Sequence, residues 1–168
     1  MTQPPTLPTQ LLPANLAHIL NKYGEWLETY QNFRDRNSAY GDFYLSPKRM
    51  EIIFPLKEHP VHGITGLHVI ERYDDQGYVK EYQYMWKVIV PKMGVQLNHI
   101  SSWGNESHNA PGTSAKLITE TEPHHHHHVP GDRSQRKENW HVHTLEQAFE
   151  FIIPFLESGQ PYPRSASL

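Results

Sequence analysis

Two segments with the composition of β-strands flank a tight-turn sequence, and this hairpin pattern constrains the fold more than any other feature. Residues 64–73 and 79–90 are rich in β-branched and aromatic side chains, and residues 74–77 between them read Asp-Asp-Gln-Gly. Acidic residues followed by glycine are typical of the turn that joins two antiparallel strands. Further strands are predicted at residues 49–54, 96–103, 116–119 and 139–143.

Helical patterns flank the predicted sheet. From residue 14 to about residue 37, apolar side chains recur at steps of three and four, which predicts an amphipathic helix. Thr144 and Gln147 have the spacing of a capping box, and an apolar stripe follows them. Pro154 is expected to kink or shorten this second helix, and Gly159 to stop it. The order predicts an α+β fold: an antiparallel β-sheet with N-terminal and C-terminal helices packed on one face.

The length and composition predict one domain. The chain has 168 residues, enough for a single hydrophobic core. Residues 1–13 hold four prolines and predict a flexible tail, residues 14–158 a single α+β domain with a His-rich loop, and residues 159–168 a second flexible tail. The chain has no cysteine, which excludes disulfides, thiolate chemistry and cysteine-based zinc sites.

The apolar residues and the charge bear on location and partners. No apolar run approaches the length of a membrane span, and the first ten residues lack the positive and apolar regions of a secretory signal. These features predict a cytoplasmic protein with no membrane association. The formal net charge of -3 gives no global attraction to nucleic acid, so any such contact must be local.

One face of the predicted strand 79–90 is aromatic. The period-2 rule places Tyr82, Tyr84 and Trp86 on the same side of the strand. Such rings most often pack in the core beneath a helix. Alternatively, they form a surface on which nucleic-acid bases stack.

Polar side chains gather where the strand predicted at residues 96–103 ends. Trp103 is followed by Gly104, and then by Asn105, Glu106 and His108. Sites are commonly built at strand ends, which makes Asn105 a candidate orienting residue and His108 a candidate catalytic group. In the alternative interpretation, Asn105 only closes a turn and Glu106 is solvated.

Five consecutive histidines, residues 124–128, lie inside the chain, well before its C-terminal helix, which argues against a purification tag. Imidazole titrates at about 6.5, so one histidine can accept the ribose 2′-hydroxyl proton while another protonates the leaving 5′-oxygen. We therefore interpret His124, His125 and His127 as catalytic candidates. Arg133, or Arg136 and Lys137, would then neutralise the phosphate.

Two other interpretations of the histidine run stay open. His124 and His126, with His108 and Glu106, have the residue types of a divalent-metal site with an open position, although no H-E-x-x-H spacing is present. The run is also compatible with a solvated tract that has no chemistry.

Several of these motifs together resemble the TumE family of prokaryotic toxins, over about residues 65–157. The resemblance rests on the tyrosine-rich strand, the Trp-x-Asn-x-x-His segment from Trp103 to His108, the Thr-x-Pro-His-His-x-His pattern of residues 121–127, and the terminal Thr-Leu-Glu helix. His126 and His128 occupy positions that the family leaves variable, and the basic segment 133–137 has the character of an insertion. The resemblance implies a toxin that attacks RNA and is paired with a cognate antitoxin.

The leading hypothesis is therefore a small ribonuclease toxin that uses histidine acid/base chemistry. Its substrate-binding candidates are Arg133, Tyr82, Tyr84, Trp86 and Trp103. The first alternative is a non-enzymatic protein that binds a divalent metal or docks a partner. The second is a metal-dependent nuclease acting on DNA or a signalling nucleotide. Whether the chain forms a homodimer or uses a metal cofactor stays open at this point.

Overall fold

The computed structural model describes residues 10–28, 30–33, 36–38, 43–90, 94–105, 126–129, 132–138 and 141–162. The helices are α1 (Leu16–Tyr23), the 3-10 turn η1 (Gly24–Trp26) and α2 (Leu145–Ser158). The strands are β1 (Tyr30–Phe33), β2 (Arg36–Ser38), β3 (Phe43–Leu45), β4 (Arg49–Pro55), β5 (Thr65–Tyr73), β6 (Val79–Val90), β7 (Gly94–Gly104), β8 (His126–Val129) and β9 (Asp132–Glu138).

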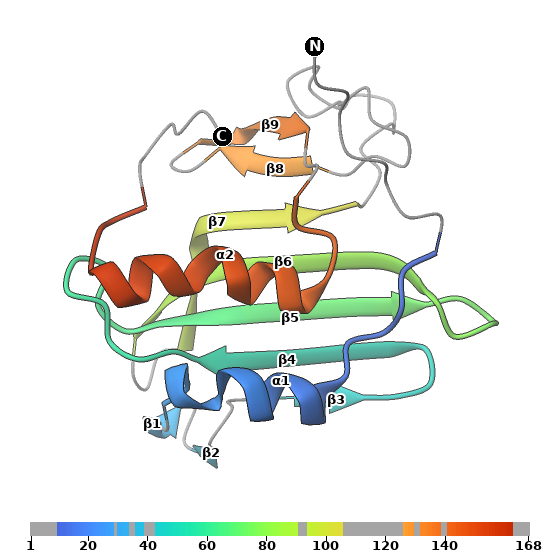
Figure 1. Cartoon of the computed structure of the whole chain (residues 1–168), viewed down its shortest axis with the longest axis horizontal. Coiled ribbons are helices and arrows are strands. Elements are labelled where there is room, and N and C mark those ends of the chain that lie inside the picture. Colours follow the sequence, from blue (N-terminus) through green and yellow to red (C-terminus); the bar gives the residue numbers. More distant parts are fainter. Residues whose placement is uncertain are drawn as a thin grey trace.

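Strands β3 to β9 form one antiparallel sheet in sequence order, and β1 pairs with β2 separately. Helices α1 and α2 lie side by side on one face of the large sheet (Figure 1). The predicted α+β fold, with both helices on one face of an antiparallel sheet, is therefore confirmed.

The β5–β6 hairpin forms where the sequence predicts it, because its turn satisfies its own backbone. The Asp74 carboxylate accepts hydrogen bonds from the amides of Gln76 (2.9 Å) and Tyr78 (3.0 Å). Gly77 adopts a φ of 89°, a left-handed conformation that costs glycine little. The turn thus fixes the register between β5 and β6.

The core lies between the sheet and the two helices. Tyr23 of α1 stacks on Phe149 of α2 with ring centroids 4.8 Å apart, and Phe149 meets Phe54 of β4 edge-on at 5.3 Å. Fully buried Trp86 of β6 lies 5.9 Å from Phe155. These aromatic contacts join both helices to the central strands.

The N-terminal helix is shorter than predicted. It ends at Tyr23, and Leu27 is already extended, whereas the sequence predicts a helix to about residue 37. Glycine at position 24 weakens the helix, and the following backbone finds partners at the end of β4. Glu28 donates its amide to Pro55 (2.9 Å), and Lys57 donates to Trp26 (2.9 Å). These tertiary backbone bonds override the apolar periodicity.

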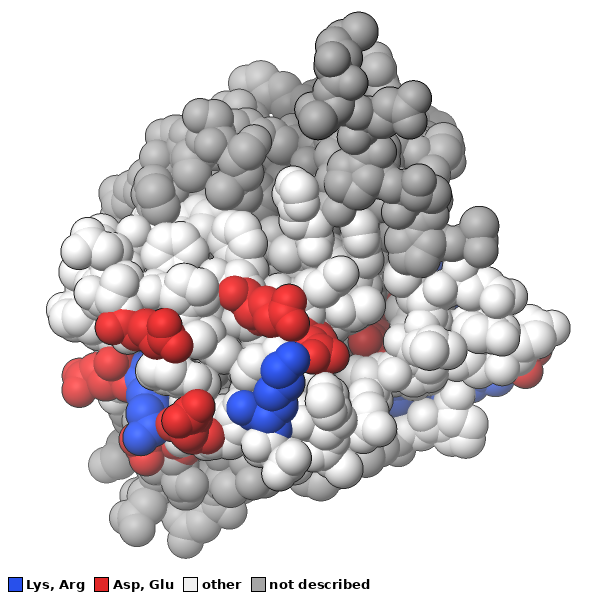
Figure 2. All heavy atoms as spheres, viewed as in Figure 1, with Lys and Arg blue, Asp and Glu red and all other residues white. Residues whose placement is uncertain are grey.

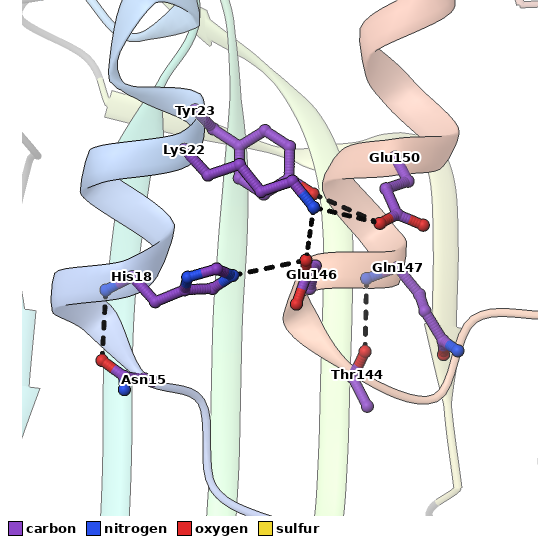
Figure 3. A network of polar contacts seen from close by, with 8 residues as sticks. All are labelled: Asn15, His18, Lys22, Tyr23, Thr144, Glu146, Gln147 and Glu150. Atoms are coloured by element: carbon purple, nitrogen blue, oxygen red, sulfur yellow. Dashed lines mark hydrogen bonds and ion pairs between the residues drawn. The ribbon is translucent and has the colours of Figure 1, made fainter.

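The capping box at α2 is confirmed, except that the Gln147 side chain bonds to the amide of the residue before the N-cap. The Thr144 hydroxyl accepts from the Gln147 amide at 3.2 Å (Figure 3). The Gln147 side chain accepts from the amide of His143 at 2.7 Å. Pro154 is accommodated inside the helix, which ends as expected at left-handed Gly159. No helix in the described ranges is both long and apolar enough to cross a membrane.

An ion-pair network links the two helices across the surface of the core. Lys22 of α1 contacts Glu146 (2.6 Å) and Glu150 (3.6 Å) of α2, and His18 lies 3.4 Å from Glu146 (Figure 3). The hydrogen bond from Lys22 lowers the pKa of the Glu146 carboxyl. The groups are largely exposed, so the network orients the helices more than it stabilises them.

The remaining strand predictions have mixed outcomes. Residues 116–119 lie outside the described residues. Of the strand predicted at residues 139–143, the described residues 141–143 are not in a strand and instead lead into the cap of α2. The histidine strand β8 and the polar strand β9 were not predicted as strands, because neither has an apolar alternation.

Residues of both predicted tails contact the body of the protein. Leu11 is buried and accepts a backbone hydrogen bond from Val79 at 2.8 Å, although its neighbour Leu12 is exposed. Tyr162 is also buried, and its ring lies 5.2 Å from that of Phe155. Part of the predicted tail 159–168 is therefore in the core.

Candidate functional site

The histidine run enters the sheet at residue 126, where it becomes β8 between β7 and β9. The register pairs His127 with Trp103 on one side and with Lys137 on the other. His126 pairs with Gly104 and Glu138, and His128 with Ser102 and Arg136. The described part of the run is thus held beside the end of β7 and beside a strand that contains three basic residues.

The sequence-predicted residues divide into three groups. His108, His124, His125 and Glu106 lie outside the described residues. His126, His127 and Arg133 lie on β8 and β9, where the backbone is described. Arg133 adjoins the turn end of β9, next to Asp132, which pairs with Val129. The residues of β9 opposite His126, His127 and His128 are Glu138, Lys137 and Arg136.

The side chain of Asn105, the residue after β7, is hydrogen-bonded to the backbone of β6. Its side-chain oxygen accepts from the Tyr82 amide at 2.8 Å, and its side-chain nitrogen donates to the Lys80 carbonyl at 3.2 Å. Its own amide donates to Tyr82 at 3.3 Å. The side chain therefore continues the ladder to β6 after β7 has ended, and it orients the strand end instead of a substrate group.

Replacing Asn105 with alanine removes the side-chain acceptor of the Tyr82 amide and the side-chain donor to the Lys80 carbonyl, both in β6. We expect the free energy of unfolding to fall by about 1–3 kcal/mol, because the part-buried Tyr82 amide loses its acceptor and the exposed Lys80 carbonyl loses its donor. Urea unfolding measures the change. The matched control is Gln83→Ala, on the same strand pair, which should change stability by less than about 0.5 kcal/mol. Equal losses in the two variants would contradict the structural role of Asn105.

The aromatic candidates are core residues. Tyr82, Tyr84, Trp86 and Trp103 are each at most 1% exposed. Tyr82 and Tyr84 stack at 5.0 Å, and the ring of Trp103 lies 5.1 Å from that of Phe151 on α2. The packing interpretation therefore holds for this structure, and the prediction of an exposed stacking surface is corrected: all four rings are buried, and α2 packs against Trp86 and Trp103.

A buried carboxylate is the polar centre of this core, and it is not among the site residues that the sequence predicts. Glu71 is 1% exposed and accepts hydrogen bonds from Tyr84 (2.5 Å), Tyr73 (3.0 Å) and the amide of Ala14 (3.0 Å). Burial raises the pKa of Glu71 above its usual value, although the three donors oppose that shift. Alternation from Leu67 and Val69 already places position 71 on the inner face, which was the available signal.

The network around Glu71 anchors the entry to α1. The Ala14 amide lies just before the helix, and Tyr84 and Tyr73 come from β6 and β5. Burial, followed by the neighbouring Glu71 charge, raises the pKa of Tyr84 well above its usual value, so the phenol stays a donor. The arrangement ties β5, β6 and the residue before α1 to one carboxylate that is only 1% exposed.

The predicted metal site consists of residues whose side chains the structure does not describe. Among the described side chains, no group of three or more histidine, aspartate or glutamate residues could hold a metal ion. The predicted ligands His108, His124 and Glu106 are outside that set, and His126 is described by its backbone alone.

Comparison of the chain with models of known protein families, with curated proteins and with solved structures finds no match.

Proposed function

We propose that this protein is the toxin of a toxin–antitoxin pair, a cytoplasmic ribonuclease that uses histidine acid/base chemistry and is silenced by a cognate antitoxin. The observation that carries the proposal is the register of β8, which sets His127 between Trp103 and Lys137. The resemblance to the TumE family, whose pattern includes Trp103, Asn105 and His127, supports the same interpretation.

The chemistry needs one group to accept a proton and another to deliver one. In the proposed step, a neutral imidazole takes the proton of the ribose 2′-hydroxyl, and the 2′-oxygen attacks the adjacent phosphorus. The bond from phosphorus to the 5′-oxygen breaks, and an imidazolium protonates that leaving oxygen. The products are a 2′,3′-cyclic phosphate and a free 5′-hydroxyl, with no net change in protons.

The chain offers residues for each role in this step. The acid/base set consists of His127, His124, His125 and His108. Two of these imidazoles act in each turnover, one as the base and one as the acid. Lys137 lies opposite His127 in the register and is a better-placed cation for the phosphate than Arg133. Asn105 holds the end of β7, which carries Trp103, in place beside β8.

Incubation of the purified full chain with single-stranded and structured RNA tests the proposal. We expect cleavage that persists in EDTA, because the proposed step uses no metal ion. A DNA strand of the same sequence should stay intact, because it lacks the 2′-hydroxyl.

Other outcomes of this assay favour the rival functions. Cleavage of RNA or DNA that EDTA abolishes would point to a metal-dependent nuclease. Absence of cleavage, combined with stoichiometric uptake of Zn²⁺ that raises the melting temperature, would point to a metal-binding protein. Either outcome would contradict the acid/base proposal.

A further inference from the structure

An open hollow of about 450 Å³ lies at the end of the sheet where the β3–β4 and β5–β6 hairpins turn. Its lining contains four cationic side chains and two carboxylates: Lys48, Arg49, Arg72, Lys80, Asp74 and Asp75, together with Tyr73. The lining thus carries a net charge of +2. Its charge is opposite to the net charge of the whole chain.

Backbone bonds between the two hairpins fix the shape of this hollow. The Tyr73 amide donates to the Lys48 carbonyl at 2.9 Å, which ties the end of β5 to the β3–β4 turn. Arg49 and Arg72 are direct cross-strand partners. The cations therefore project from a rigid frame, which lowers the entropy cost of binding an anion.

The carboxylates at the hollow already have partners. Asp74 accepts from two amides of its own turn, and Asp75 forms an ion pair with Lys48. Arg49 and Arg72 pair with Glu51 (3.1 Å) and Glu81 (3.4 Å) on the strands. Lys80 is exposed, and no described carboxylate lies within ion-pair distance of its ammonium group. Lys80 is therefore the cation most available to a ligand.

The helix-covered face is acidic, whereas the lining of the hollow is basic, and this difference in charge favours an anionic ligand at the hollow. Acidic side chains predominate over the described part of that face, and Lys22 there is engaged with Glu146 and Glu150 (Figure 2). A polyanion would be repelled by the helices and attracted to the hairpin end of the sheet.

The hollow and the histidine strand lie at the same end of the sheet. Gln83 of β6 pairs with Gly104, and Gly104 pairs with His126. Lys80 lies three residues before Gln83, about 10 Å along the strand, and β8 lies two strand spacings from β6, again about 10 Å. A single strand of a few nucleotides is long enough to span the distance between Lys80 and β8.

We infer that this hollow is a phosphate subsite that holds the backbone of a single-stranded RNA beside the histidine strand. The inference rests on the proposed function for its substrate. Lys80 supplies a direct phosphate contact, and Arg72 and Lys48 supply charge from the two hairpins. These contacts bind phosphate without reading sequence.

Binding of a fully 2′-O-methylated RNA oligonucleotide tests the subsite apart from cleavage, because that probe lacks the attacking hydroxyl. Fluorescence anisotropy over a salt series gives both the affinity and its salt dependence. Lys80→Ala is expected to lower the slope of log affinity against log salt by about 0.7 and to weaken binding about fivefold at 0.1 M salt. Lys80→Ala combined with Arg72→Ala should lower both further.

Matched controls and a competitor make each outcome decisive. Lys57→Ala removes another exposed lysine, just beyond β4 at the opposite end of the sheet, and should leave binding unchanged. Wild-type affinity and slope in both hollow variants would overturn the inference, as would failure of the wild type to bind the probe. Stronger competition by tripolyphosphate at equal phosphate concentration would also overturn it, because a compact polyphosphate would then be the ligand. The cleavage assay on ordinary RNA judges the proposed function independently of these results.

Discussion

Replacing His127 with alanine is expected to reduce the rate of RNA cleavage by about 10²- to 10⁴-fold, the usual effect of removing a general acid or base. His127 is the catalytic candidate that lies on a described strand, between Trp103 and Lys137 in the register. Single-turnover cleavage of a labelled RNA at neutral pH measures the rate. The melting temperature of the variant should match that of the wild type within about 2 °C, since replacing one polar side chain on the strand next to the sheet edge changes stability little.

The matched control is His128→Ala, which removes a histidine from the same run and the same strand. Positions 127 and 128 are neighbours on β8 and so belong to opposite faces of the sheet. We expect His128→Ala to cleave RNA within about threefold of the wild type. Equal losses in both variants would mean that the run acts through its total charge, and unchanged cleavage in His127→Ala would remove His127 from the acid/base set.

Glu71→Ala is expected to lower the free energy of unfolding by roughly 2–4 kcal/mol, because Tyr84 and Ala14 then keep buried donors without an acceptor. Chemical denaturation of the full chain measures the loss. Glu81→Ala, which removes an exposed carboxylate that pairs with Arg72, should cost less than about 0.5 kcal/mol. Similar losses in the two variants would contradict the role of Glu71 as the polar centre of the core.

Glu71→Gln should change how stability depends on pH. Burial raises the folded-state pKa of Glu71 above its usual value of 4.5, so the folded protein holds this proton more tightly than the unfolded chain. The contribution of Glu71 to stability is therefore full below about pH 4.5 and is lost as the pH rises through the raised pKa. The stability of the wild type relative to Glu71→Gln should fall over that window in urea unfolding at a series of pH values. A difference independent of pH would contradict the raised pKa.

The parts of the fold that could be predicted from the sequence are those where local chemistry and tertiary packing agree. Asp74 and Gly77 specify the β5–β6 turn, and Thr144 with Gln147 specifies the start of α2. The end of α1 could not be predicted, because Leu27 and the residues around it follow the bonds offered by β4 and not their own periodicity. Tertiary partners decide such boundaries.

Strands β8 and β9 illustrate a different limit. Histidine tracts and the segment DRSQRKE have no apolar face, so nothing in their pattern predicts a strand. Pairing of β8 with β7, and of β9 with β8, supplies the backbone partners of these two strands. The sequence therefore identified the histidines as the residues of interest and located their neighbour Trp103, but it did not predict which cations lie opposite them.

The sequence predicted which residues lie near the candidate site better than it predicted what each of them does. Asn105 was expected to orient a catalytic group, but its amide is engaged by the backbone of β6. Period 2 correctly placed Tyr82, Tyr84 and Trp86 on one face, and only the position of α2 decides that this face is the core. Side-chain periodicity gives a face, and it does not say what covers that face.

Cleavage of an oligonucleotide with a single ribonucleotide in a DNA strand tests the proposed chemistry most directly. We expect one cut, immediately 3′ of the ribose, in the presence of EDTA, with mass spectrometry showing a 2′,3′-cyclic phosphate and a 5′-hydroxyl. The same strand with a 2′-deoxy sugar at that position should stay intact. Cleavage of the all-deoxy strand, or products that carry a 5′-phosphate, would contradict histidine-driven attack by the 2′-oxygen.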